Sequence, residues 1–148
     1  MKERCFVNTK IPILKRLDNL FGLPLVYVSY LFIKPKRDPA LHPSRFLFIR
    51  PGGIGDAVLL IPAIKAVKKK YPDANIDVLA ERRNSAVFSM CPDVKSVYNY
   101  DSPKERSKAI RNKYDTVIDT EQWHMLSAVV ARMTRAPVAI GFATNERK

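Results

Sequence analysis

From Arg45 onward, apolar and polar positions follow two different periods along the chain. Short runs rich in aromatic and β-branched residues are typical of strands, and longer stretches with apolar residues at helical spacing are typical of helices. The first pattern predicts strands at RFLFI (45–49), NIDVLAE (75–81), SVYNY (96–100), YDTVIDTE (114–121) and VAIGF (138–142). The second predicts helices over residues 56–71, 84–90, 102–113 and 124–135.

The order of these elements predicts the fold class. Strands that are joined by a crossover helix run parallel, and the helices cover the faces of the sheet. The sequence therefore predicts an α/β domain over residues 45–148, with a Rossmann-like parallel sheet and flanking helices.

The helix predicted over residues 56–71 follows the loop RPGGIGDAVL (50–59). Asp56 stands where an N-cap carboxylate would accept backbone N–H bonds, so capping is its first expected role. Ser102 is expected to cap the helix over residues 102–113 in the same way. The apolar stripe of the first helix is predicted to comprise Val58, Leu59, Ile61, Ile64, Ala66 and Val67.

Polar residues follow the ends of the predicted strands. In an open parallel sheet these positions meet at one edge, and ligands bind at that edge. The residues expected there are 50–56, 81–83, 101, 119–124 and 141–145. The sequence therefore predicts a ligand site along this edge.

The first 44 residues form a basic and apolar extension that differs from the rest of the chain. Residues 19–33 carry no charged side chain, and lysines and arginines flank them on both sides. The run is shorter than the roughly 20 residues that span a bilayer as a helix. It fits either a helix in the membrane interface or an amino-terminal helix docked on the domain. Three prolines in KPKRDPALHPSR (34–45) predict a linker after it.

The chain is strongly basic. Its 26 lysines and arginines exceed its 14 aspartates and glutamates by 12, and residues 1–50 contribute +7 from ten basic and three acidic residues. Such a surface attracts nucleic acid, anionic lipid or phosphorylated small molecules. No nucleic-acid motif or zinc spacing is present, so nucleic acid is not an expected partner. Cys5 and Cys91 form no C-x-x-C pair, which favours a reducing compartment.

The glycine-rich loop lacks a complete nucleotide-binding fingerprint. The dinucleotide pattern G-x-G-x-x-G would need a glycine where Val58 stands. A Walker loop would need Lys followed by Ser or Thr, and neither follows these glycines. Glu81 does end the second predicted strand, where a ribose-binding acid would lie. A stand-alone nucleotide-binding module therefore stays as an alternative.

Besides nucleotide binding, Asp56 gives the loop the chemistry of a general base. It stands at the end of the first strand, beside glycines that let another molecule approach the backbone. A carboxylate in that place can accept a proton from a substrate hydroxyl. Capping and base chemistry are compatible only if one carboxylate oxygen, or one side-chain rotamer, remains free to face the ligand.

Two stretches of the chain resemble a known enzyme family. They are FIRPGGIGDAVLLIPAIKAVKKKYPDANIDVLAE (48–81) and DTVIDTEQWHMLSAVVARMTRAPVAIGFATN (115–145). Together they resemble the amino-terminal half of glycosyltransferase family 9, the heptosyltransferases that extend the lipopolysaccharide core. The most specific parts are G-D-x-x-x-x-x-P-A, from Gly55 to Ala63, and the final G-F at residues 141–142.

The resemblance implies both an architecture and a reaction. Members have two Rossmann-like domains that face a cleft, the GT-B arrangement; the amino-terminal domain handles the acceptor, and the other holds the nucleotide sugar, typically ADP-heptose. Asp56 matches the family's proposed general base, which would deprotonate an acceptor hydroxyl as it displaces the nucleoside diphosphate with inversion. The implied acceptor is a lipid-linked saccharide at the cytoplasmic face of the bacterial inner membrane. Neither a metal nor another cofactor is expected.

Several further residues are candidates for contact with the acceptor. They are Arg50, Gly52, Gly53, Gly55, Lys104, Arg106, Glu121 and His124. The glycines would keep the loop close to the sugars, and the basic side chains could meet acceptor carboxylates or phosphates. Lys104 and Arg106 fit a solvated helix face as well, and a lone histidine such as His124 is often structural.

The chain is shorter than a complete two-domain member of this family would be. A carboxyl-terminal nucleotide-sugar domain is expected to be absent from it, so that the donor would bind mainly elsewhere. We therefore expect a fragment, a truncated gene product or half of a split enzyme, with a second-domain polypeptide as partner and little activity alone. A non-catalytic membrane-surface protein is the remaining alternative.

Overall fold

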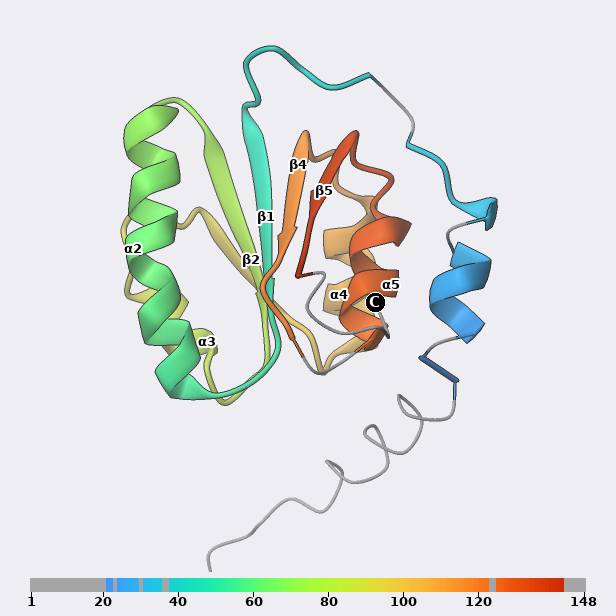
Figure 1. Cartoon of the computed structure of the whole chain (residues 1–148). Coiled ribbons are helices and arrows are strands. Elements are labelled where there is room, and N and C mark those ends of the chain that lie inside the picture. The colour runs from blue at the N-terminus through green and yellow to red at the C-terminus, as the bar shows by residue number, and fades with distance from the viewer. Residues whose placement is uncertain (1–20, 23, 30, 36–37, 123–124, 143–148) are drawn as a thin grey trace, which may run out of the picture.

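A computed structural model describes residues 21–22, 24–29, 31–35, 38–122 and 125–142. Its centre is a five-stranded parallel sheet in the order β3-β2-β1-β4-β5 (Figure 1). The strands are β1 (Arg45–Arg50), β2 (Asn75–Ala80), β3 (Ser96–Asn99), β4 (Thr116–Asp119) and β5 (Val138–Ile140). The helices are α2 (Ile54–Lys70), α3 (Ser85–Ser89), α4 (Pro103–Arg111) and α5 (Met125–Met133).

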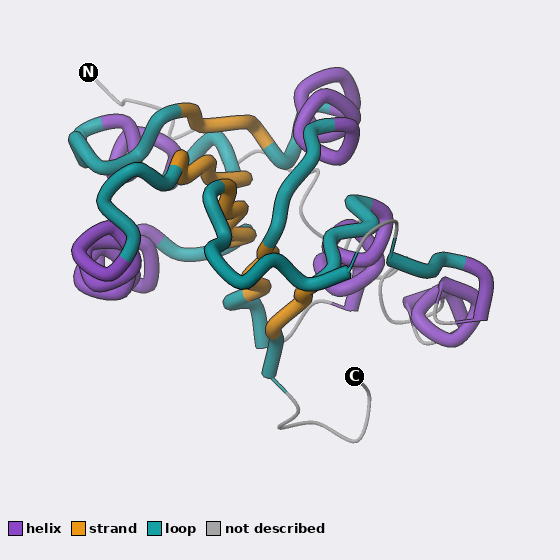
Figure 2. Tube along the Cα trace, turned by 90° about the horizontal axis from the view of Figure 1, so that it is seen from above, coloured by secondary structure: helices purple, strands orange, loops and turns teal. Residues whose placement is uncertain are grey.

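Helices cover both faces of this sheet. In Figure 1, α2 and α3 lie on one side of the strands, whereas α4 and α5 lie on the other. Seen from above in Figure 2, the strands form the middle layer between the helices. The predicted α/β class and the Rossmann-like parallel sheet are therefore confirmed.

The central strand β1 contributes to the core on both faces of the sheet. Phe46 and Phe48 belong to the cluster that packs against α2 and α3. Leu47 and Ile49 belong to the cluster that packs against α4 and α5. Because each fully buried apolar side chain contributes about 1.5–3 kcal/mol, β1 is firmly held and gives the loop after it a rigid base.

The strand register brings the predicted edge together. Arg50 of β1 lies beside Ala80 of β2, and Ile49 lies beside Asp119 of β4. The Thr120 N–H extends this pairing, because it donates to the Ile49 carbonyl at 3.0 Å. The loops after β1, β2 and β4 therefore begin at the same edge, as the sequence predicted.

The start of α2 differs from the prediction. Gly53 is its N-cap residue, with an extended backbone and no side-chain cap, and the helix begins at Ile54. Asp56 therefore lies within the first turn, and its predicted capping role is wrong. Since the helix dipole favours negative charge near the amino terminus, the carboxylate still stabilises this end of α2.

The core-facing stripe of α2 also differs from the predicted one. The residues that face the core are Ala57, Leu60, Ile61, Ile64 and Val67. Val58, Leu59 and Ala66 are exposed, contrary to the prediction. The apolar sequence over residues 57–61 fits more than one helical phase, and packing against the sheet selects the phase that buries Ala57.

The predicted cap of α4 is confirmed. Ser102 is its N-cap residue, and the Ser102 hydroxyl accepts a hydrogen bond from the Glu105 N–H at 3.4 Å. The Glu105 carboxylate accepts from the Asn99 N–H at 2.7 Å, so it also ties the helix start to the end of β3. Together these contacts fix the loop between β3 and α4.

A further helix precedes the sheet, with residues 21–22, 24–29 and 31–32 in helical conformation. In Figure 1 it is blue and lies on the α5 side of the molecule, away from α2. Within the described residues, no helix has both the length and the apolar character needed to cross a membrane. Residues 1–20, including Cys5, lie outside the described part of the chain.

Candidate active site

The loop between β1 and α2 turns the chain abruptly from strand to helix. Pro51 is fully buried, and Gly52 adopts a φ of +142°, which residues with a side chain rarely adopt. Gly53 then takes the extended conformation of an N-cap residue. This path brings the first turn of α2 back beside the end of β1, so that Asp56 and Arg50 meet.

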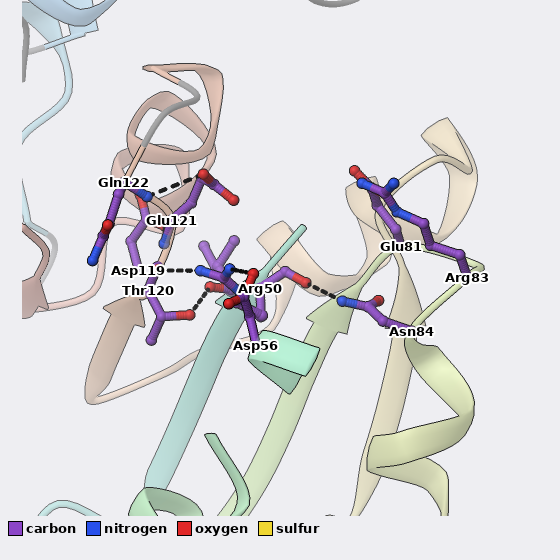
Figure 3. A network of polar contacts seen from close by, with 10 residues as sticks. Arg50, Asp56, Glu81, Arg83, Asn84, Asp119, Thr120, Glu121 and Gln122 are labelled. Carbon is purple, nitrogen blue, oxygen red and sulfur yellow. Dashed lines mark hydrogen bonds and ion pairs between the residues drawn. The ribbon is translucent and has the colours of Figure 1, made fainter. Parts of the chain in front are cut away.

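Arg50 holds Asp56 in an ion pair (Figure 3). The guanidinium Nη2 donates to Asp56 Oδ2, while Nη1 donates to the carbonyl of Thr120, the residue after β4. The Arg50 side chain is only 12% exposed. It therefore links the β1–α2 loop to the β4–α5 loop and fixes the aspartate between them.

Asp56 keeps one carboxylate oxygen available for other chemistry. Its side chain is 54% exposed, and its ion pair with Arg50 uses Oδ2. Among the described residues, none donates a hydrogen bond to Oδ1. A carboxylate with one anchored oxygen and one accessible oxygen is suited to accept a proton from a bound hydroxyl group.

Glu121 lies close to Gly52 on the side of β4. A Cβ atom at Gly52 would lie 3.4 Å from Glu121 Oε2 and 3.5 Å from Arg50 Nη2. Glu121 is buried; its Oε1 accepts from the Gln122 N–H at 3.1 Å, and its own N–H donates to Asp119 Oδ1 at 3.0 Å. The structure thus places Glu121 next to the loop, and its contact with an acceptor stays a prediction.

Two residues outside the set of acceptor candidates support Arg50. Asn84, which is fully buried after β2, donates its Nδ2 to the Arg50 carbonyl at 3.0 Å. Thr120 accepts from the guanidinium, and its hydroxyl donates to the Ile49 carbonyl at 2.9 Å. Most of these contacts involve main-chain carbonyls, so no pattern of residue types could have indicated them.

The remaining acceptor candidates are not joined to this ion pair. Lys104 and Arg106 lie on α4, and neither forms a hydrogen bond or ion pair with Arg50. Arg106 donates to the Tyr100 carbonyl at 2.9 Å, and its guanidinium lies 5.6 Å from the Tyr100 ring centroid. Their contact with an acceptor stays a prediction. His124 lies outside the described residues.

Glu81, the residue that would bind a ribose if the domain were a nucleotide-binding module, already has a partner. Glu81 Oε2 lies 2.6 Å from Arg83 Nε at the end of β2 (Figure 3). A ribose hydroxyl would have to compete with this ion pair. In the described part of the chain, no three His, Cys, Asp or Glu side chains are grouped so that they could hold a metal ion.

Fold and site together define a Rossmann-like domain that presents a half-exposed aspartate on a glycine-rich loop at its ligand edge. The chain is 33% identical over 107 residues to lipopolysaccharide heptosyltransferase 3 of Escherichia coli. This match covers 64% of the chain and 31% of that enzyme. No family model matches the chain.

Two solved structures share the fold. The E. coli ADP-heptose lps heptosyltransferase II matches 66% of this chain and 30% of its own, with a TM-score of 0.58 and 23% identity. The glycosyl transferase family 9 structure from Veillonella parvula matches 71% and 34%, with a TM-score of 0.59 and 17% identity. The chain is therefore homologous, over part of its length, to lipopolysaccharide heptosyltransferase 3, and it shares its fold with part of these two solved structures.

Proposed function

We propose that this chain forms the acceptor-side domain of a glycosyltransferase of the heptosyltransferase type. The observation that carries the proposal is the placement of Asp56. Arg50 anchors one of its carboxylate oxygens, and its side chain is 54% exposed at the ligand edge. The partial homology to a lipopolysaccharide heptosyltransferase supports the reaction class.

In this proposal Asp56 is the general base. The hydroxyl oxygen of the acceptor attacks the anomeric carbon of the donor, the bond from that carbon to the diphosphate breaks, and the nucleoside diphosphate leaves with inversion. The hydroxyl proton passes to Asp56 Oδ1. An ionised aspartate is a weak base, but the hydroxyl loses its proton only as the anomeric carbon becomes positive, and general-base assistance of this kind contributes about 10²- to 10⁴-fold.

Arg50 would act as a positioning residue for this step. Its guanidinium already donates to both Asp56 and the Thr120 carbonyl, so it holds the base in place. Since catalytic geometry depends on displacements as small as about 1 Å, a base tied to two loops of a rigid sheet edge is well placed. The glycines on the other side of the loop would allow the sugars to approach its backbone.

The donor would bind mainly to a second domain. The chain spans about 31% of the length of the curated relatives it matches. We propose that a nucleotide-sugar domain, on the same polypeptide or on a partner, faces the Asp56 loop and supplies the contacts to the leaving group. An ADP-heptose-like sugar is the donor that the relatives suggest.

The acceptor would be a lipid-linked saccharide of the lipopolysaccharide-core type, which places the reaction at the inner face of the bacterial inner membrane. The basic surface supports an anionic acceptor, since the chain carries a net charge of +12. Phosphates and carboxylates of the core would be attracted to such a surface.

The experiment that tests this function is transfer of radiolabelled heptose from ADP-heptose to a truncated lipopolysaccharide core. The chain would be joined to the carboxyl-terminal domain of heptosyltransferase 3. Asp56→Asn should lower kcat by about 10²- to 10⁴-fold. Asp73→Asn, at an exposed aspartate in the turn before β2, should leave kcat within about twofold, as is usual for surface substitutions. Unchanged turnover of the Asp56→Asn protein would remove Asp56 from the mechanism.

A further inference from the structure

Within the described residues of the helix that precedes the sheet, most of the large apolar side chains are exposed to solvent. The exposed ones are Phe21, Leu25, Tyr27, Val28, Leu31 and Phe32. The small residues Gly22 and Ser29 are buried instead. A surface helix of a globular domain normally presents polar residues to solvent, so the apolar exposed side of this helix is unusual.

Helical geometry gathers these side chains on one face. Residues spaced at i, i+4, i+7 and i+11 lie on the same side of an α-helix, and Phe21, Leu25, Val28 and Phe32 have this spacing. Leu31, which is 67% exposed, extends the same face. We call these five residues the outer face of the helix. The outer face consists of aliphatic and aromatic side chains and carries no charge.

Positive charge flanks this uncharged segment. Residues 19–33 contain no charged side chain; Lys15, Arg16 and Asp18 precede them (+1), and Lys34, Lys36, Arg37 and Asp38 follow (+2), so the flanking sequence carries a net charge of +3. Lys34 is exposed directly after the helix. An apolar helix face in a segment whose flanking sequence is net basic is complementary to an anionic lipid surface, where the apolar side chains enter the acyl boundary and cations such as Lys34 meet the headgroups.

We propose that the outer face of this helix binds the surface of an anionic phospholipid bilayer. The helix lies in the plane of the interface, because the distance along it from Phe21 to Phe32, its first and last described helical residues, is only about 17 Å at 1.5 Å per residue, less than the roughly 30 Å hydrocarbon core. Tyr27, which is exposed beside the outer face, suits the headgroup level. A protein partner or a second copy of the chain would not need the flanking charge. The inference does not depend on the transfer reaction.

The test is cosedimentation of the full chain with vesicles of equimolar phosphatidylethanolamine and phosphatidylglycerol, compared with phosphatidylcholine alone. Leu31→Ser combined with Phe32→Ser should lower the partition coefficient on the anionic vesicles by about tenfold or more. The matched control combines Leu59→Ser with Met90→Ser. These side chains are 78% and 77% exposed on the α2 and α3 side of the sheet, and their loss should change partitioning by less than about twofold.

A second readout reports insertion directly. In a Trp123→Phe background, Phe32→Trp should give a blue-shifted emission when the anionic vesicles are added, because the indole leaves water. Asp56→Asn should bind vesicles like the unaltered chain, so membrane binding and catalysis are separately testable. Equal binding by the Leu31/Phe32 double variant, or no binding by the unaltered chain, would overturn the proposal. A dimer that the double variant abolishes, without vesicle binding, would show that the face joins two copies.

Discussion

Arg50 and Asp56 stand six residues apart in the chain and form an ion pair across the glycine turn. The same guanidinium donates to the Thr120 carbonyl, so the aspartate is fixed relative to two loops of the sheet edge. Ion pairs with one largely exposed partner contribute only about 0–1 kcal/mol to stability. The contribution of this pair is therefore to the geometry of the loop more than to the stability of the fold.

A first prediction concerns the role of Arg50 in transfer. Arg50→Gln should lower kcat by roughly 10- to 100-fold, because Asp56 loses its anchor, while the KM for the acceptor changes less. Arg50→Lys should recover part of the loss, since a lysine can pair with Asp56 but lacks the planar fork that reaches Thr120 as well. Steady-state kinetics on the joined two-domain protein measure both.

The opposite kinetic pattern would give Arg50 a different role. A large rise in the KM for the acceptor with unchanged kcat would show that Arg50 contacts the acceptor itself. The positioning role would then be contradicted, and the acceptor-binding role predicted from the sequence would be supported.

A second prediction concerns Gly52 of this loop and Gly55 in the first turn of α2. Gly52→Ala should destabilise the fold by about 1–3 kcal/mol, because a φ of +142° is strained for alanine. Gly55→Ala is the matched control: it lies in α2 with no atom within 4 Å of its Cβ position. It should be neutral or stabilising by up to about 1 kcal/mol. Urea unfolding measures both changes, and equal effects would contradict the account.

A third prediction concerns Asn84, whose side-chain amide donates to the Arg50 carbonyl at 3.0 Å. Asn84→Ala should lower the free energy of unfolding by about 1–3 kcal/mol, because the partly buried Arg50 carbonyl loses this hydrogen bond. Asn75→Ala, which removes an exposed hydrogen bond with Lys95, should cost less than about 0.5 kcal/mol. A cost for Asn84→Ala no larger than that for Asn75→Ala would show that the Asn84 bond does not support the loop.

Tyr114 forms a separate buried network away from the candidate site. Its hydroxyl donates to Asp77 Oδ2 at 3.0 Å and accepts from Asn112 at 3.1 Å. Burial, with the nearby Asp77 carboxylate, raises the pKa of the Tyr114 hydroxyl well above its ordinary value. The folded state therefore keeps this proton under alkaline conditions in which an exposed tyrosine loses it.

A fourth prediction follows from that raised pKa. Above about pH 10 the unfolded chain loses the Tyr114 proton while the folded chain retains it, so the free energy of unfolding falls as the pH rises. This contribution is complete below about pH 10, and its loss adds a slope of up to about 1.4 kcal/mol per pH unit above it. Tyr114→Phe should remove the added slope in urea unfolding between pH 9 and 11. Identical slopes in the two proteins would contradict the prediction.

Much of the fold could be predicted from the sequence, because the buried strands are marked by local composition. RFLFI is apolar on both faces, as a central parallel strand between two helical layers must be, and NIDVLAE is apolar on one face, with Ile76 and Val78. The phase of α2 could not be predicted in the same way. Ala57 and Val58 fit a buried position equally by pattern, and only packing against the sheet decides that Ala57 is the buried one.

The candidate site was predicted in position but not in its contacts. The residues after β1, β2 and β4 had to share an edge, so Arg50, Asp56 and Glu121 were found together. The ion pair depends on the backbone path through Gly52, and the support from Asn84 depends on a main-chain carbonyl. Neither contact leaves a periodic or compositional trace in the chain.

The most direct test of the acceptor-side assignment is an NMR titration of the ¹⁵N-labelled chain. Deacylated lipopolysaccharide core saccharide should shift the amide resonances of Gly52, Gly53 and Gly55, and ADP-heptose at the same concentration should leave them unchanged. Shifts of these amides with ADP-heptose and none with the saccharide would contradict the account and would instead show a nucleotide-binding module.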